Sequence, residues 1–462
     1  MTRSVVGRGL LGSIADVATA AATTRVNPVA LLAAGARHGV HFGALLSAAA
    51  RRFGDRTALV DEFGELSYDE LWDLAAARDL GPEPVAIQCE DDRWLLVGVG
   101  AAALSGADVT LVGPQGAPPS PHLPRVVVAA DVAASTRGRA RTRTASALTL
   151  LTTGSTGEPK SVERSRFHIA QMLPAASLIA ALGLRPREPV LVLPPLFHGH
   201  GFSLATACLM VGAPIIVGPT ASAVTLARQH RVGIVAGVPA QLHALVGADL
   251  PTVRLVAAGS ARLPGTLATS LLESFDVVDF FGTTETGTAT IARAGDLRAG
   301  TLGRPAAGVR ISVADASGTL VARGTEGWVR VQSAFAVSGR TPLLSGDRGW
   351  IDASGRLVHA GRADGVTVSG GESVSAERLE QFLRAQPEIG DADVTIVPDD
   401  RLDSALAARV VLSAPLAADE LRERVRLTLG RQYVPRDLEL QPPSGSTASR
   451  TSRARSSRPR RR

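Results

Sequence analysis

The chain has 462 residues, enough for more than one domain, and its 45% hydrophobic content excludes a largely disordered protein. The net charge of +6 is local, because residues 441–462 hold seven arginines and no acidic residue, and this argues against a nucleic-acid-binding fold. Two cysteines give neither a disulfide framework nor a metal cluster and suit a reducing compartment. No apolar run is long enough to span a bilayer, and Asp16 interrupts the apolar stretch near the N-terminus. We therefore expect a cytoplasmic protein without a transmembrane segment, and peripheral membrane contact is left open.

Secondary structure is predicted first for residues 41–112, which read as a helix, short strands and βα units, with Ser67 or Asp69 capping a helix. From residue 148 onward, short β-rich runs alternate with stretches of helical composition. The runs are 148–151, 190–193, 215–218, 234–238, 254–258 and 276–280, and the helical stretches include 168–182, 222–231 and 265–274. This alternation predicts a mostly parallel sheet covered by helices on both faces.

After residue 300 the sequence pattern changes, and it predicts shorter strands joined by Gly-rich turns. A small α+β piece follows from about 362 to 440, with helices near 376–386 and 418–430. We therefore predict an N-terminal α/β domain over 1–361, a mobile C-terminal domain over 362–440, and a Ser/Arg-rich tail over 441–462 that is expected to be disordered.

A phosphate-binding loop is predicted where residues 148–162 read LTLLTTGSTGEPKSV. Glycines let a backbone approach a polyphosphate, hydroxyls and N–H groups donate to its oxygens, and Lys160 adds a positive charge. The segment is not a Walker A loop, because Pro159 stands directly before the lysine. An ordinary Ser/Thr/Gly turn is the alternative, and the order of these residues disfavours it.

This loop resembles the signature loop of the adenylate-forming enzymes, which comprise acyl-CoA synthetases, peptide-synthetase adenylation domains and luciferases. The family usually reads Thr-Ser-Gly-Thr-Thr-Gly-x-Pro-Lys-Gly, and Ser161 replaces the last glycine. Residues 281–285, Phe-Gly-Thr-Thr-Glu, match a second family pattern, aromatic-Gly-x-Thr-Glu. The resemblance implies that Phe281 stacks on adenine, Thr284 contacts the α-phosphate and Glu285 holds Mg²⁺. A carboxylate is a suitable hard ligand for that ion.

Further motifs follow in the family order. His198, in Pro-Leu-Phe-His, corresponds to a residue beside the carboxylate-binding tunnel, while His200 is assigned no chemistry. Ser260 belongs to a segment that resembles the strand beneath adenine. It is not expected to be a hydrolase nucleophile, because Arg262 stands where the nucleophile elbow needs its last glycine.

The C-terminal motifs complete the resemblance. Asp347, in Ser-Gly-Asp, would accept both ribose hydroxyls, and Arg362, in Gly-Arg-Ala-Asp, would contact ribose or phosphate. Their spacing of 15 positions predicts a short hairpin between them. Asp364 would be the hinge between the domains, and residues 370–371 would line the CoA channel.

The site implied by the resemblance has an ATP-binding and a catalytic part. The ATP-binding residues are Thr152, Thr153, Gly154, Ser155, Thr156, Gly157, Lys160, Gly259, Ser260, Ala261, Phe281, Gly282, Thr283, Thr284, Asp347 and Arg362. The catalytic residues are Lys160, His198, Thr284 and Glu285, the metal ligand is Glu285, and the CoA-binding residues are Gly370 and Gly371.

One family element is absent. Family members end on a loop that reads roughly Pro-x-x-x-x-Gly-Lys, whose lysine reaches the acid carboxylate and the α-phosphate. Here Lys160 is the only lysine, and residues 441–450 contain none. A reading-frame change near 441, partial substitution by Arg450, or loss of adenylation would each explain this. Losing such a contact costs ~3 kcal/mol, or about a hundredfold in rate, so we expect weak adenylation with nucleotide binding kept.

The predicted function is ATP-dependent activation of a carboxylic acid to an acyl-adenylate, followed by thioester formation with CoA. The acid is predicted to be a fatty acid. ATP, Mg²⁺, CoA and a small-molecule acid are the expected ligands, and no nucleic acid is expected. The alternatives are an enzyme that adenylates an aryl or amino acid, and a non-catalytic homologue that binds an adenylate or acyl group. The oligomeric state is not predicted.

Overall fold

The computed structural model describes residues 4–7, 18, 41–89, 92–113, 125–135, 146–153, 159–164, 171–334, 341–362, 366–370, 372–399 and 401–441. The chain divides into two units. The first comprises Met1–Ser375 and Pro398–Ala405, and the second comprises Ala376–Val397 and Leu406–Arg462. The domain limits at 361/362 and 440/441 stay predictions, and the tail lies outside the described residues from 442 onward.

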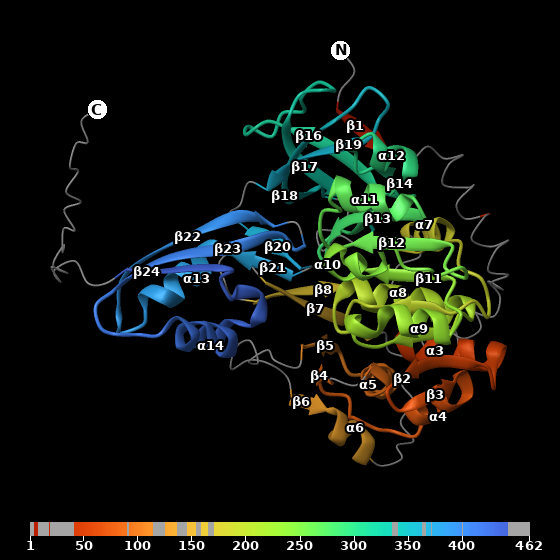
Figure 1. Ribbon diagram of the computed structural model, residues 1–462. Coiled ribbons are helices and arrows are strands. Elements are labelled where there is room, and N and C mark those ends of the chain that lie inside the picture. Colours follow the sequence, from red (N-terminus) through yellow and green to blue (C-terminus); the bar gives the residue numbers. More distant parts are fainter. Residues whose placement is uncertain are drawn as a thin grey trace, which may run out of the picture. The chain divides into compact units, whose positions relative to one another are not determined.

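The first unit is built on a nine-stranded sheet of order β15-β14-β13-β12-β11-β9-β10-β2-β3 (Figure 1). The strands are β2 (Thr57–Asp61), β3 (Gly64–Ser67), β9 (Val190–Val192), β10 (Ile215–Val217), β11 (Ile234–Gly237), β12 (Leu255–Gly259), β13 (Asp276–Thr283), β14 (Gly287–Arg293) and β15 (Arg304–Pro305). The six strands from β13 to β2 in this order run parallel, and β14, β15 and β3 add antiparallel edges. The mostly parallel sheet is therefore confirmed, although the run at 148–151 belongs to another sheet.

Helices cover both faces of this sheet, as predicted. Because successive strand residues point to opposite faces, Val190 and Val192 join one buried cluster while Leu191 and Leu193 join the other. The first cluster includes helices α3 (Phe42–Phe53), α5 (Asp92–Ser105), α7 (Met172–Leu182) and α8 (Gly199–Val211), and the second includes α9 (Ala223–Gln229), α10 (Pro239–Leu242) and α11 (Gly265–Leu272). Each fully buried Leu, Ile or Val contributes about 1.5–3 kcal/mol, so both faces of the sheet are firmly held.

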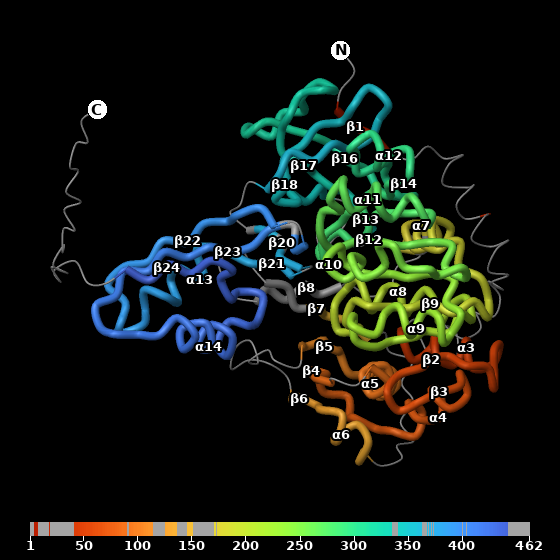
Figure 2. Tube along the Cα trace, viewed as in Figure 1, coloured from red at the N-terminus to blue at the C-terminus, as the bar shows by residue number. Residues whose placement is uncertain are grey.

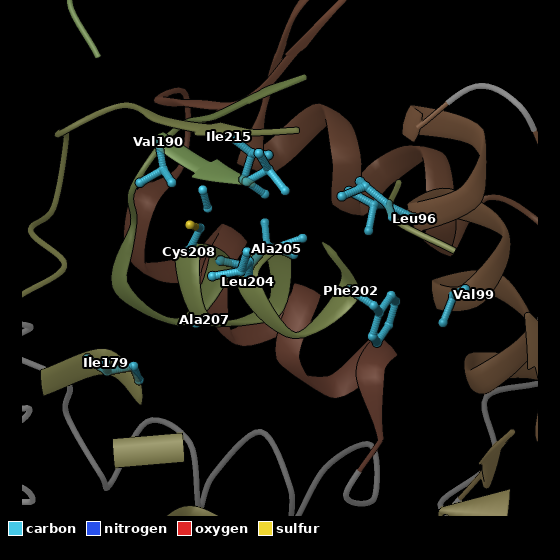
Figure 3. Packing of buried hydrophobic residues seen from close by; sticks show 14 of the residues in the cluster. Leu96, Val99, Ile179, Val190, Phe202, Leu204, Ala205, Ala207, Cys208 and Ile215 are labelled. Carbon is cyan, nitrogen blue, oxygen red and sulfur yellow. The ribbon is translucent and has the colours of Figure 1, made fainter. Parts of the chain in front are cut away.

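Helix α8 carries the predicted site residue His198 at its N-terminus and is anchored by its apolar side. Figure 3 shows Leu204, Ala205 and Cys208 among the residues of strands β9 and β10, while Phe202 lies on the side of α5. Cys208 and Cys89 are both buried.

A second sheet, of order β6-β4-β5-β7-β8, carries the phosphate loop. Its strands are β4 (Val85–Gln88), β5 (Val109–Leu111), β6 (Arg125–Val128), β7 (Leu148–Thr153) and β8 (Pro159–Arg164), with helices α4 (Tyr68–Ala76) and α6 (Ala129–Ala134) nearby in sequence. Ser67 caps α4 in a capping box: the N–H of Glu70 donates to its hydroxyl at 3.1 Å, and its own N–H donates to the Glu70 carboxylate at 2.8 Å. Ser67, and not Asp69, is thus the cap.

An antiparallel sheet of order β1-β16-β17-β18-β19 positions the ribose-side motifs. Its strands are β1 (Val5–Gly7), β16 (Arg310–Ala314), β17 (Gly327–Gln332), β18 (Leu343–Ile351) and β19 (Leu357–Arg362). Figure 2 shows β16, β17 and β18 close together in the backbone trace. Asp347 lies opposite Arg362 in the β18–β19 pair, which confirms the predicted hairpin. The hairpin of β20 (Val366–Ser369) and β21 (Glu372–Ser375) and helix α12 (Ala294–Arg298) also belong to the first unit.

The second unit contains helices α13 (Ala376–Arg384) and α14 (Ala418–Leu429), which confirms both predicted helices. It also holds most of β22 (Ile389–Asp399) and β23 (Asp403–Leu412), and β24 (Asp437–Gln441) pairs in parallel with β23. Leu379, Leu383, Leu421, Val425 and Tyr433 are fully buried. Short 3-10 turns occupy Thr220–Ser222, His243–Leu245 and Arg431–Tyr433. Within the described ranges, the helices are all too short or too polar to cross a bilayer.

Candidate functional site

The phosphate loop connects two paired strands. Thr152 lies opposite Lys160, and Thr153 lies opposite Pro159, at the end of the antiparallel β7–β8 pair. The strands therefore bring the two ends of the predicted loop together. Residues 154–157, with the predicted hinge Asp364 and the predicted CoA-binding residue Gly371, lie outside the described residues.

The β13–β14 turn presents the second motif. The N–H of Thr283 donates to the hydroxyl of Thr286 at 3.1 Å, and the N–H of Thr286 donates back to the hydroxyl of Thr283 at 3.3 Å. Thr286 is buried, with 1% of its surface exposed, so these bonds hold the turn rigidly. Thr284 and Glu285 are consequently left at the tip, both half-buried.

Glycine is required at position 282 by the close approach of the two strands of this hairpin. A Cβ on Gly282 would lie 2.0 Å from the carbonyl oxygen of Gly287, far inside van der Waals contact. The register also shifts between Phe281 and Gly282, where the hairpin has a bulge. Bulges re-aim side chains near functional sites, and this one lies directly after the expected adenine-stacking ring.

Three of the predicted nucleotide residues come together at the β18–β19 pair. Arg362 Nη1 lies 3.5 Å from Asp347 Oδ1, and His359 Nε2 lies 3.1 Å from the same oxygen. The Phe281 ring lies 6.2 Å from the His359 ring, centroid to centroid, at 52°. The Asp347 side chain is 4% exposed, and its Oδ2 has no hydrogen-bond partner among the residues that the structure describes. The site thus holds a buried carboxylate with one oxygen paired and the other without a partner among the described residues.

His198 occupies the N-cap position of α8 and lies beside strand β21 of the same unit. Its Nε2 is 2.5 Å from Oε1 of Glu372 on β21, and its ring packs on Phe197 at 4.4 Å. The helix can begin here because Gly201 has no side chain: a Cβ would lie 2.3 Å from the carbonyl oxygen of Pro195. The predicted carboxylate-side histidine therefore lies next to the segment predicted to line the CoA channel.

His200, which sequence reasoning left without a role, contacts a predicted site residue. Its Nδ1 lies 3.0 Å from the hydroxyl of Ser260, and its Nε2 is buried with no partner within the described ranges. Burial, with a smaller contribution from His198, lowers the pKa of His200 to about 4, so the imidazole is neutral near pH 7. Ser260 directly follows β12 with a φ of 66°, a left-handed conformation that is costly for a residue other than glycine. Gly259, before it, is buried, and Ala261, after it, is half-buried.

Asp279 is a second residue that the motifs did not indicate. It lies two positions before Phe281 on β13 and is 3% exposed, and its Oδ1 has no partner within the described ranges. Burial raises the pKa of this carboxyl to about 7, against a smaller opposing effect of the hydrogen bond from the Phe280 backbone.

The described residues offer Mg²⁺ at most a small number of protein ligands. No group of three or more His, Cys, Asp or Glu residues with metal-binding geometry occurs among the described residues. Mg²⁺ commonly takes one or two carboxylates together with substrate phosphates and water. Glu285, half-buried at the tip of the β13–β14 turn, fits that smaller requirement. Of the two predicted CoA-binding residues, the structure describes Gly370. This residue adopts a φ of 59°, and its N–H donates to the Leu402 carbonyl at 3.1 Å.

Comparison with known proteins identifies the class. Residues 120–339 match the family described as AMP-binding enzyme. This match confirms the recognition made from the motifs for residues 120–339, which form an AMP-binding domain.

Acyl-CoA ligases are among the relatives. A 2-succinylbenzoate–CoA ligase from Bacillus pumilus is 27% identical over 59% of this chain and 60% of its own length. A (7a-methyl-1,5-dioxo-octahydro-1H-inden-4-yl)propanoyl:CoA ligase from Mycobacterium tuberculosis is 30% identical over 59% of this chain and 57% of its own length. The chain thus matches about 60% of the length of these curated relatives.

Solved structures confirm the α/β fold. A double mutant of o-succinylbenzoate CoA synthetase from Bacillus subtilis, bound to a product analogue, superimposes with a TM-score of 0.76 at 20% identity, covering 86% of this chain and 94% of that one. A malonyl-CoA ligase with methylmalonyl-CoA and AMP bound gives a TM-score of 0.68 at 26% identity, covering 84% and 96%.

Proposed function

We propose that this protein is an AMP-forming acid–thiol ligase, which activates a carboxylic acid with ATP and transfers the acyl group to CoA. The observation that carries the proposal is the cluster of Phe281, Asp347 and Arg362. These residues come from separate motifs of the first unit. Arg362 lies 3.5 Å from Asp347 Oδ1, and the Phe281 ring lies beside His359, which also contacts that oxygen. The Asp347 Oδ2 is buried and lacks a partner among the described residues. A buried, unpartnered oxygen is costly unless a ligand satisfies it, and a ribose diol supplies two donors.

The remaining roles follow from the chemistry of the reaction. The acid attacks the α-phosphorus of ATP and expels pyrophosphate, which brings anions together and requires neutralisation of charge. In the proposal, the loop at 152–157 and Lys160 hold the phosphates, Thr284 donates to the α-phosphate, and Arg362 contacts ribose or phosphate. Gly259, Ser260, Ala261, Gly282 and Thr283 complete the nucleotide site.

Glu285 would hold Mg²⁺ together with phosphate oxygens and water. The ion would supply Lewis-acid stabilisation of the developing charge. As a carboxylate on a turn fixed by Thr283 and Thr286, Glu285 needs little reorganisation to serve as that ligand.

The thiol half-reaction would use the segment that contacts His198. In the proposal, His198 positions the acid, and Gly370 and Gly371 line the path of CoA. The 2.5 Å contact between His198 and Glu372 supports a shared location for these functions. Rotation of the predicted 362–440 domain about Asp364 would alternate the two half-reactions.

The acid is proposed at the level of a small-molecule carboxylic acid. The names of the relatives quoted above contain acids with aromatic or fused-ring groups and carbonyls, and they give the predicted fatty acid no support. The same names, all of CoA ligases, do not favour an amino-acid-adenylating enzyme or a non-catalytic homologue. A cytoplasmic location stays a prediction.

The test uses the full chain with Mg·ATP, CoA and a panel of straight-chain, aryl and keto acids. We expect pyrophosphate release and acyl-CoA formation with at least one acid, both strongly reduced in Asp347→Asn. Asp419→Asn is the matched control, because that side chain is 99% exposed on α14, and it should leave both products unchanged. ATP binding without pyrophosphate release for any acid would overturn the proposal.

A further inference from the structure

We propose that His359 is a nucleotide-positioning residue, which fixes the Asp347 carboxylate so that its second oxygen is directed to the ribose hydroxyls. This inference rests on the proposed function, and it names a residue that none of the motifs contains. His359 lies three positions before Arg362 on β19.

The two oxygens of Asp347 have different surroundings. Oδ1 lies 3.1 Å from His359 Nε2 and 3.5 Å from Arg362 Nη1, whereas Oδ2 is buried and has no partner among the described residues. The Asp347 side chain is only 4% exposed, so bulk solvent has little access to it. His359 and Arg362 both lie at Oδ1, so the Asp347 carboxylate cannot rotate freely. Its Oδ2 therefore stays free to accept a hydrogen bond from a ligand.

A bulge in the β18–β19 pair makes this arrangement possible. In a regular strand, residues three positions apart point to opposite faces of the sheet. Here Asp347 pairs with Arg362 while Gly349 pairs with His359, so one extra residue lies in β19, and the register shifts after Arg348. His359 and Arg362 therefore share the face of Asp347.

Glycine at 349 is a requirement of the same bulge. A Cβ there would lie 2.2 Å from the carbonyl oxygen of Val358. The two strands thus approach closely at the bulge, and the bulge brings two donors to one carboxylate.

His359 also contacts the expected adenine-binding side. Its ring centroid lies 6.2 Å from that of Phe281, and its side chain is 16% exposed. The imidazole thus lies between the residue proposed to stack on adenine and the residue proposed to bind ribose. A purely structural histidine would fill space here, whereas a positioning histidine must also donate through Nε2.

The experiment separates donation from packing with two variants of the full chain. His359→Phe keeps a ring against Phe281 but removes the donor, and His359→Gln keeps an N–H donor. Binding of ATP and of 2′,3′-dideoxy-ATP is measured by calorimetry. We expect His359→Phe to weaken ATP binding about tenfold, the effect of losing one hydrogen bond to a charged group, and His359→Gln to restore most of it.

The dideoxy nucleotide reports on the ribose hydroxyls directly. Since it lacks both hydroxyls, wild type and His359→Phe should bind it equally. His230→Phe, a change at the end of α9, is the control and should bind ATP as wild type does. The inference is overturned if His359→Phe binds ATP normally, or if it loses affinity equally for both nucleotides. Failure of wild type to bind ATP at all would instead refute the proposed function and, with it, this role.

Discussion

The substitution Asp279→Asn is expected to remove a pH dependence from the stability of the first unit. Burial raises the pKa of Asp279 from its ordinary value of 3.8 to about 7. Below about pH 4 the carboxyl is protonated in both the folded and the unfolded state, so it has no net effect. Between the two pKa values only the unfolded chain loses its proton, and the free energy of unfolding falls as the pH rises. Above about pH 7 the full loss, ~4 kcal/mol, is reached.

The assay follows from these values. Between pH 5 and pH 8, Asp279 alone should lower the free energy of unfolding by about 2–3 kcal/mol. All four tryptophans of the chain, at 72, 94, 328 and 350, lie in the first unit, so urea unfolding followed by tryptophan fluorescence reports on it. Asp279→Asn should lose this difference, and the cost of burying an amide cancels because it is the same at both pH values.

Asp276→Asn is the matched control, since Asp276 is an exposed carboxyl at the start of the same strand. It should keep the pH dependence of wild type. If wild type and Asp279→Asn change equally between pH 5 and pH 8, the buried carboxyl does not have the raised pKa, and the reasoning is refuted.

Further changes test the metal, the helix start and the missing lysine. Glu285→Gln should lower acid-dependent pyrophosphate release about a hundredfold while metal-free ATP binding stays within about twofold, and equal rates would remove Glu285 as the Mg²⁺ ligand. Gly201→Ala should lower the free energy of unfolding by about 2–3 kcal/mol, measured in urea, because its Cβ meets a carbonyl oxygen at 2.3 Å. Gly265→Ala, with open space around its Cβ, is the control, and equal losses would contradict the steric account. Replacing residues 441–450 by a segment ending in Gly-Lys should raise adenylation about a hundredfold, and an unchanged rate would show that the lysine is not the limiting element.

The sequence predicted the parallel part of the fold well, because its strands are buried on both faces and read as continuous apolar runs between helices. The antiparallel edges were missed. Strand β14 alternates less clearly, and β1, with only three residues, pairs with β16 about 300 positions later. Nothing local in such a short strand specifies its partner.

The residues of the candidate site likewise fall into those that the sequence predicted and those that it could not indicate. Motif spacing predicted the Asp347–Arg362 hairpin, since both residues lie on adjacent strands joined by a short turn. It could not indicate His359, because only the bulge brings that residue to the face of Asp347. The His200–Ser260 contact was missed for a related reason: it joins the first turn of α8 to the end of β12, 60 positions apart.

The central claim is that a carboxylate attacks the α-phosphorus of ATP in this protein, and oxygen transfer tests it most directly. An acid labelled with oxygen-18 in its carboxylate is incubated with Mg·ATP, CoA and the full chain, and the nucleotide product is examined by mass spectrometry. The account predicts AMP that carries one labelled oxygen, formed in step with acyl-CoA. Unlabelled AMP, or ADP with labelled phosphate, would contradict it.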